Sequence, residues 1–176
     1  MKEDGLTNND AFTRKEILTL VNMVISKTSD SNTKQLGVQL PYTHLKDLDL
    51  RTLPLDRVNF RGCRLEKIRF DECTLESANF KDCYIDGCSF TKADLKKCDL
   101  RNTEMRNCNF TDSDMKFVSL QNASFKDVVM KNANLQFGNM SGSNWRDAQL
   151  EGANLDKIYD SLKEGNNVSN VKKVSL

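Results

Sequence analysis

The residues best suited to chemistry in this sequence are its cysteines. The chain of 176 residues contains six cysteines but a single histidine, His44. Such a density of cysteine in a small protein is typical of a zinc site, a disulfide framework or a reactive thiol. No two of them form the Cys-x-x-Cys pair that many zinc sites use. The cysteines are Cys63, Cys73, Cys83, Cys88, Cys98 and Cys108.

The spacing of the cysteines belongs to a period that runs through most of the chain. Every fifth residue from Leu40 to Leu155 is large and apolar, although only 38% of the residues are hydrophobic. Two places before each of these lies a second series, which is small or modest in size from Cys73 onward and includes all the cysteines. Residues two apart point to the same side of an extended backbone. The period therefore indicates short extended steps, apolar on one side, that turn repeatedly and wind into a solenoid.

Several of these steps resemble the units of the pentapeptide-repeat family: "SANFK", "KADLK", "NASFK", "NANLQ", "DAQLE" and "GANLD". The resemblance implies an all-β solenoid, a right-handed quadrilateral parallel β-helix with four units in each coil and about six coils here. Neighbouring coils would then lie about 4.8 Å apart, one inter-strand spacing. In the first coil, Leu48 and Leu53 are larger than the usual small residue and Pro54 precedes Leu55. We therefore expect this coil to be distorted.

This register predicts that the cysteines are small hydrophobic residues of the core. Cys63 and Cys83 lie one coil apart, as do Cys88 and Cys108, which is within the Cα separation of a disulfide. Parallel side chains on neighbouring rungs do not readily give the disulfide torsion. A stacked column also lacks the convergent ligands of a zinc site. We expect no metal, no cofactor and no reactive thiol.

The segment before the repeat predicts a helix that covers the open end of the solenoid. Thr13 and Glu16 fit a capping box, and Phe12 with Ile17 fits a hydrophobic staple. The helix either caps the first coil or offers a surface groove to another protein. Its apolar stripe consists of Ile17, Leu20, Val21, Val24 and Ile25.

The segment after the repeat predicts a second, shorter cap. Asn154 fits a helix N-cap and Gly165 a stop, with Leu155, Ile158, Tyr159 and Leu162 between them at helical spacing. The chain then divides into four parts: a flexible N-terminus (1–10), a capping helix and connector (11–37), the β-helix (38–157), and a C-terminal cap with a flexible tail (158–176). The helix expected at the C-terminal end favours a monomer over an end-to-end homodimer.

Composition excludes several functional classes. The chain has 26 Lys and Arg residues against 25 Asp and Glu residues, so no net charge favours nucleic acid. It has no apolar run long enough to span a membrane and no signal peptide in "MKEDGLTNNDAF". We expect a cytoplasmic protein, or one delivered into a host cell by a route independent of a signal peptide. Because no catalytic triad, phosphate loop or paired buried carboxylates occur, we expect no enzyme activity.

Function is then expected on the outer surface, since solenoids bind through extended faces. Phe117 and Phe137 fall on outward positions of one column, where large aromatic residues are unusual. They are either covered by the C-terminal tail or form a partner contact together with Lys96, Lys97 and Lys116. A weaker basic ladder on another face is formed by Arg61, Lys81 and Arg101.

These features predict a non-catalytic protein–protein interaction module or adaptor, whose protein partner the sequence does not identify. The family resemblance extends to secreted bacterial effectors, which this chain could join. The alternative is a protein that interacts with DNA gyrase or topoisomerase, of the quinolone-resistance type. Rods of that type tend to be acidic on the surface that imitates DNA, whereas this chain has Lys and Arg on every face.

Overall fold

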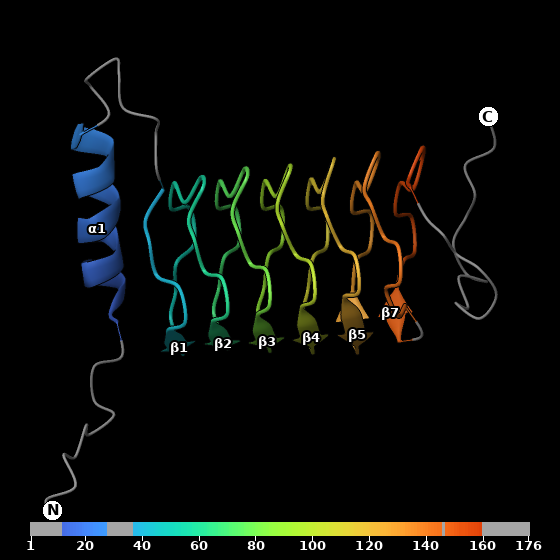
Figure 1. Ribbon diagram of the computed structural model, residues 1–176, viewed down its shortest axis with the longest axis horizontal. Coiled ribbons are helices and arrows are strands. Elements are labelled where there is room, and N and C mark those ends of the chain that lie inside the picture. Colours follow the sequence, from blue (N-terminus) through green and yellow to red (C-terminus); the bar gives the residue numbers. More distant parts are fainter. Residues whose placement is uncertain (1–11, 28–36, 146, 160–176) are drawn as a thin grey trace, which may run out of the picture.

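The repeat forms a rod of stacked coils with a helix at its N-terminal end (Figure 1). The computed structural model describes residues 12–27, 37–145 and 147–159. One flank of the rod carries the strands of a parallel sheet in the order β1-β2-β3-β4-β5. These strands are β1 (His44–Lys46), β2 (Arg64–Glu66), β3 (Tyr84–Asp86), β4 (Glu104–Arg106) and β5 (Ser124–Lys126). A second parallel pair is formed by β6 (Val128–Val129) and β7 (Ala148–Gln149).

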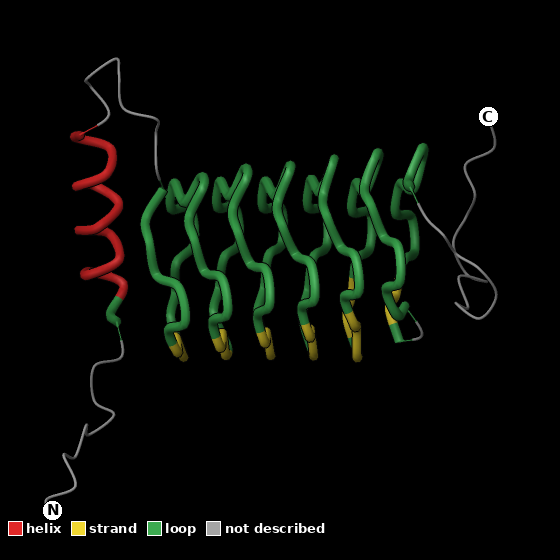
Figure 2. Tube along the Cα trace, viewed as in Figure 1, coloured by secondary structure: helices red, strands yellow, loops and turns green. Residues whose placement is uncertain are grey.

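The register between coils is 20 residues on every side of the rod. Leu45 pairs with Leu65 in the five-stranded sheet, and isolated parallel bridges such as Asn59 with Asn79 continue the stacking on the other sides. Figure 2 shows that strands occupy one flank, while the remaining sides consist of turns and loops. The solenoid expected from the five-residue period and the parallel β-helix implied by the family resemblance are therefore confirmed.

Each five-residue step ends in a corner with an unusual backbone conformation. The second residue after every large apolar residue, from Tyr42 to Phe137, has a positive φ between 51° and 68°. At most corners the backbone closes a β-turn, as where the Cys63 amide donates to the Phe60 carbonyl at 2.9 Å. The left-handed corner sends its own side chain outward, so corner residues of successive coils form columns along the rod.

The interior is filled by the large and small series that the sequence predicted. The large residues are buried from Leu40 to Leu150, and phenylalanines of successive coils stack within the rod. Phe70, Phe90 and Phe110 have ring centroids 4.9 and 4.7 Å apart and nearly parallel planes. Aromatic pairs of this kind add about 0.5–1.5 kcal/mol to the burial of their area.

The first coil is regular, so the expected distortion at Pro54 is wrong. Pro54 forms a parallel bridge with Thr74 like its equivalents in later coils. In those coils the amide at this place donates to the preceding coil, as Thr74 does to the Leu53 carbonyl. The first coil has no preceding coil among the described residues. A proline there removes only a donor that would lack a coil partner, which is why proline suits an edge.

The helix α1 (Arg14–Lys27) begins with the capping box that the sequence predicted. The Thr13 amide donates to Glu16 Oε2 at 2.7 Å, and the Glu16 amide donates to Thr13 Oγ1 at 3.3 Å. Ile17 and Val21 are buried in the same apolar core as the coils. Leu20 and Val24 pack against this core, so the helix covers the first coil with this part of its apolar stripe. No helix within the described residues is long and apolar enough to cross a membrane.

The C-terminal end differs from the sequence-based expectation. Asn154 does not begin a helix, because its amide donates to the Ala133 carbonyl at 2.9 Å and continues the coil. Tyr159 likewise bridges to Asn139 in the coil below. Leu155 and Ile158 fit both a helix and the repeat. Their spacing of three residues occurs in a helix, and it is also the distance from a large place of the repeat to the next small place. The rest of the predicted cap (160–176), the N-terminus (1–10) and most of the connector (28–36) lie outside the described residues.

Candidate functional site

One corner column carries the aromatic residues that the sequence singled out. Lys97, Phe117, Phe137 and Lys157 occupy the same corner place in successive coils, and their φ values are 57°, 59°, 61° and 53°. We call these four residues the Phe column. The carbonyl and amide groups behind it are used between coils, as where the Phe117 amide donates to the Gln136 carbonyl at 2.9 Å. The amides of the column therefore offer no free donor to another molecule, which would contact the exposed side chains.

The two phenylalanines of the Phe column stack on one another in solvent. Their ring centroids lie 5.0 Å apart with an interplanar angle of 9°. Phe117 is 50% exposed and Phe137 is 41% exposed, whereas the phenylalanines inside the rod are buried. The stacked faces cover each other, so the ring edges form the outer surface of the pair.

A left-handed conformation is unfavourable for phenylalanine. The clash of Cβ with the following carbonyl costs roughly 1–2 kcal/mol per residue, and only Gly, Asn and Asp visit this region routinely. Phe117 and Phe137 accept this conformation and also expose a large apolar area. Neither feature stabilises the fold, so the pair is a candidate for function.

The lysines around the phenylalanines have different partners. Lys96 Nζ lies 2.6 Å from Asp94 Oδ2, and this hydrogen bond raises the pKa of Lys96. Lys97 Nζ lies 2.6 Å from Glu76 Oε1. Lys157 Nζ lies 5.5 Å from the centroid of the Phe137 ring, a cation–π contact that the sequence did not suggest.

The predicted contact residues are thus brought together, with Lys157 added at one end. Lys116 directly precedes Phe117 and lies one coil after Lys96, and its backbone amide donates to Asp114 Oδ1 at 3.3 Å. The sequence did contain the signal for Lys157, since it lies 20 residues after Phe137. Because residues 154–162 were expected to form a helix, Lys157 was not assigned to the column.

The second predicted feature, the ladder of Arg61, Lys81 and Arg101, is a weaker candidate. Arg101 holds Asp99 through two hydrogen bonds of 2.8 and 2.6 Å, and Arg61 Nε lies 3.2 Å from Asp82 Oδ2. Two of its three cations are therefore neutralised within the chain. Exposed pairs of this kind contribute about 0–1 kcal/mol and leave little charge for a partner.

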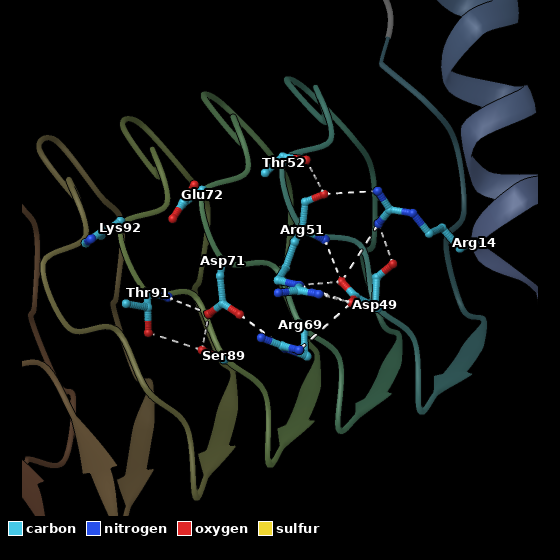
Figure 3. A pocket seen from close by; sticks show the side chains of 10 residues that line it. All are labelled: Arg14, Asp49, Arg51, Thr52, Arg69, Asp71, Glu72, Ser89, Thr91 and Lys92. Carbon is cyan, nitrogen blue, oxygen red and sulfur yellow. Dashed lines mark hydrogen bonds and ion pairs between the residues drawn. The ribbon is translucent and has the colours of Figure 1, made fainter.

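A polar pocket lies on another face, where α1 meets the first coils (Figure 3). Its walls include Asp49, Arg51, Arg69 and Asp71, which form a chain of ion pairs: Arg51 to Asp49 at 2.6 Å, and Arg69 to Asp71 at 3.4 Å. The hydrogen bond from Arg51 holds the pKa of Asp49 well below its usual range. A carboxyl with a lowered pKa is a poor general acid or base near neutral pH.

One pocket residue has a clear structural role. Arg14 of α1 donates to the carbonyls of Asp49 and Arg51, at 2.5 and 3.1 Å. In later coils the equivalent carbonyls accept from the coil before them, as the Arg69 carbonyl accepts from Leu50. Arg14 therefore satisfies edge carbonyls that have no coil partner and fastens the helix to the rod.

The cysteines are buried and free, as the register predicted. Cys73 and Cys83 donate through Sγ to carbonyls of the preceding coil, Leu50 and Phe60, at 2.9 Å. Burial raises the pKa of Cys73 to about 11 and that of Cys83 to about 12. Thiols held protonated in this way are weak nucleophiles and weak metal ligands. No cluster of three or more His, Cys, Asp or Glu suited to a metal occurs among the described residues.

Comparison with known proteins gives two family matches. A model of the pentapeptide repeat region matches residues 83–159, and a model of eight pentapeptide repeats matches residues 55–91. No curated protein sequence matches the chain.

Several solved structures are similar to this chain. Rfr23, a pentapeptide repeat protein from the cyanobacterium Cyanothece 51142, is 18% identical, with a TM-score of 0.44 over 72% of this chain and 82% of that one. QnrB1, a plasmid-mediated fluoroquinolone resistance protein, is 15% identical, with a TM-score of 0.43 over 77% and 82%. A pentapeptide repeat protein from the Arabidopsis thaliana thylakoid lumen is 22% identical, with a TM-score of 0.24 over 61% and 68%.

Proposed function

The chain belongs to the pentapeptide-repeat family, and we propose that it acts as a non-catalytic protein-binding module with the Phe column as its contact surface. The observation that carries the proposal is the exposed, stacked pair of Phe117 and Phe137. Both residues occupy a conformation that disfavours them, on a fold whose other corners from 47 onward use charged or polar residues or glycine, while Tyr42 is the aromatic residue of the first corner. Exposed aromatic residues beside cations are frequent anchors of protein interfaces.

The proposal is tested by affinity capture with the full chain as bait and mass spectrometry of what it retains. The informative variant is F117N/F137N, because Asn tolerates the left-handed corner and should preserve the fold. The matched control is Tyr42→Asn, which removes a 70% exposed ring from the same kind of corner on another column. We expect one set of proteins to be retained by the wild type and by Y42N and lost with F117N/F137N. An identical set for all three baits would contradict the proposal.

Two further experiments test whether the target is a topoisomerase and whether the protein is delivered into a host cell. A gyrase supercoiling assay with and without the protein should show no change, because Lys and Arg pair with acidic residues on the described surface, as in Arg61–Asp82 and Arg101–Asp99. A change in supercoiling would favour the topoisomerase alternative. A reporter fused to residues 1–30 tests delivery by a secretion-competent bacterium, which would place the protein partner in a host cell.

A further inference from the structure

We propose that the Phe column binds an amphipathic α-helix that lies along the rod and carries acidic residues beside its apolar stripe. This inference rests on the proposed function and names the chemistry of its partner. It follows from the spacing of the column, from the use of its backbone groups and from the balance of charge around it.

The spacing of the column matches a helix better than a strand. Its side chains repeat once per coil, and the two phenylalanine rings lie 5.0 Å apart. Along an α-helix, apolar residues at i, i+3 or i+4, and i+7 repeat at about 5.3 Å on average. Side chains on one face of a strand repeat at about 6.7 Å. Over two rungs a helix therefore stays within about 1 Å of register, whereas a strand slips by more than 3 Å.

The backbone of the Phe column offers no free amide donor to an added strand. The amides of Lys97, Phe117 and Phe137 donate to carbonyls of the next coil, at 2.9, 2.9 and 3.2 Å. A strand gains affinity by pairing its main chain with a free edge, and these amides are already paired. A helix satisfies its own backbone groups and needs only side-chain contacts.

The carboxylates around the phenylalanines are each engaged by a donor of the chain. Glu76 is used by Lys97, while Asp94 and Asp114 face Lys96 at 2.6 and 3.9 Å. Asp156 Oδ2 accepts a hydrogen bond from Gln136 Nε2 at 3.4 Å.

Two cations are left without such a partner. Within the described ranges, Lys116 and Lys157 have no ion pair. Cations that have no ion pair and lie beside an apolar pair are complementary to a helix with Asp or Glu next to its apolar stripe.

The test is selection from a displayed library of helical peptides of 16 residues, with full-length wild-type protein as target and F117N/F137N protein for counter-selection. Affinities of enriched peptides are then measured by fluorescence anisotropy. We expect enriched peptides to have apolar residues at i and i+3 or i+4 flanked by Asp or Glu. They should bind F117N/F137N at least about tenfold more weakly and bind Y42N equally well. Charge reversal by K116E/K157E should weaken the same peptides, by about threefold or more.

The outcomes separate this inference from the proposed function. Enriched peptides that depend on Phe117 and Phe137 but are basic, or rich in proline, would overturn the acidic helix and leave the binding surface standing. Failure to enrich any peptide that depends on the phenylalanines would count against both.

Other occupants of the column also have distinct signatures, and each would overturn the inference. If a second copy covers the column, the protein is a dimer by light scattering and F117N/F137N makes it a monomer. If the tail covers it, the full chain bearing V171S/V174S/L176S binds the enriched peptides at least about tenfold more tightly than the wild type does.

Discussion

Two corner columns of the rod have the same left-handed backbone conformation but carry opposite kinds of side chain. Asp82, Asn102, Asn122 and Gly142 form one column, which we call the Asn column, with φ between 57° and 72°. Asn102 donates to Asp82 Oδ1 at 2.9 Å, and Asn122 donates to Asn102 Oδ1 at 3.3 Å. A Cβ at Gly142 would lie 2.5 Å from Asn122 Oδ1, so the glycine leaves room for the amide below it.

The Phe column shares this backbone but not this chemistry. Its residues make no hydrogen-bonded ladder between rungs, and Phe117 and Phe137 neither favour the left-handed region nor hide their rings. The Asn column is thus explained by the stability of the rod, whereas the Phe column requires a reason outside it. The difference shows that the repeat fixes the backbone conformation of the corner but not the type of its side chain. A corner side chain can therefore serve contact with another molecule.

The largest expected effect comes from the interior that both columns share. Burial raises the pKa of Cys73 to about 11 and the pKa of Cys83 and Cys108 to about 12, from the ordinary 9.0. Above the unfolded pKa the folded chain keeps protons that the unfolded chain has lost. The free energy of unfolding should be independent of the thiols below pH ~8 and fall above pH ~9, by about 1.4 kcal/mol per thiol per pH unit.

Urea unfolding followed by circular dichroism at pH 8 and pH 10 measures this fall. The matched variant is Cys98→Ala, because alanine occupies the same inward place at Ala78 and Ala93. Its fall between the two pH values should be smaller than that of the wild type, since lysine and tyrosine titrate equally in both. Equal falls in the two proteins would contradict the prediction.

A smaller effect is expected from breaking the Asn column at its glycine. Gly142→Ala adds a Cβ in the left-handed region and forces the Asn122 amide away from its place. We expect a loss of about 2 kcal/mol in the free energy of unfolding, about half from the backbone and half from the lost hydrogen bond. Gly87→Ala is the control, because its nearest contact would be Lys67 Cγ at 3.4 Å. It should cost about 1 kcal/mol, from the backbone alone.

Removal of the first acceptor in the Asn column should have a smaller effect. Asp82→Ala takes away the partner of Asn102 and of Arg61. We expect a loss of about 1 kcal/mol relative to Asp127→Ala, which changes an exposed aspartate at a corner of the same conformation. Thermal unfolding of the two variants side by side gives the difference, and equal stabilities would mean that the ladder contributes nothing.

The smallest effect on stability is expected from converting the Phe column toward the Asn column. F117N/F137N loses a stacked aromatic pair of about 0.5–1.5 kcal/mol and gains residues that suit the left-handed corner. We expect the free energy of unfolding to stay within about 1 kcal/mol of the wild type while partner binding is lost. A destabilisation of 3 kcal/mol or more would show that the phenylalanines serve the fold and would remove the argument for a contact surface.

Much of the fold follows from the order of residues. The five-residue period identified the inward places of Leu65, Cys83 and their equivalents, and the capping box at Thr13 identified the start of α1. The same register placed Phe117 beneath Phe137, and the structure stacks the two rings. The five-residue period can be recognised in the sequence because each unit is short and every unit follows the same pattern.

Other features escaped the sequence for physical reasons. Leu155 and Ile158 satisfy a helical spacing and the repeat alike, so the end of the rod could not be told from a helix. Pro54 looks like a disruption until its coil is known to be the first, where an amide at this place would have no preceding coil to donate to. The role of Arg14 depends on two carbonyls about 35 residues away that are satisfied only once the helix is docked.

The sequence by itself determined which residues face inward and which face outward, because a strict period forces every step to bury the same places. Only the tertiary structure decided which outward charges meet. Lys97 pairs with Glu76 in the coil below, and Lys157 lies over Phe137 without a carboxylate partner among the described residues. These contacts depend on the directions in which the long side chains extend between stacked coils. They determine which charged groups remain unpaired and available to a partner.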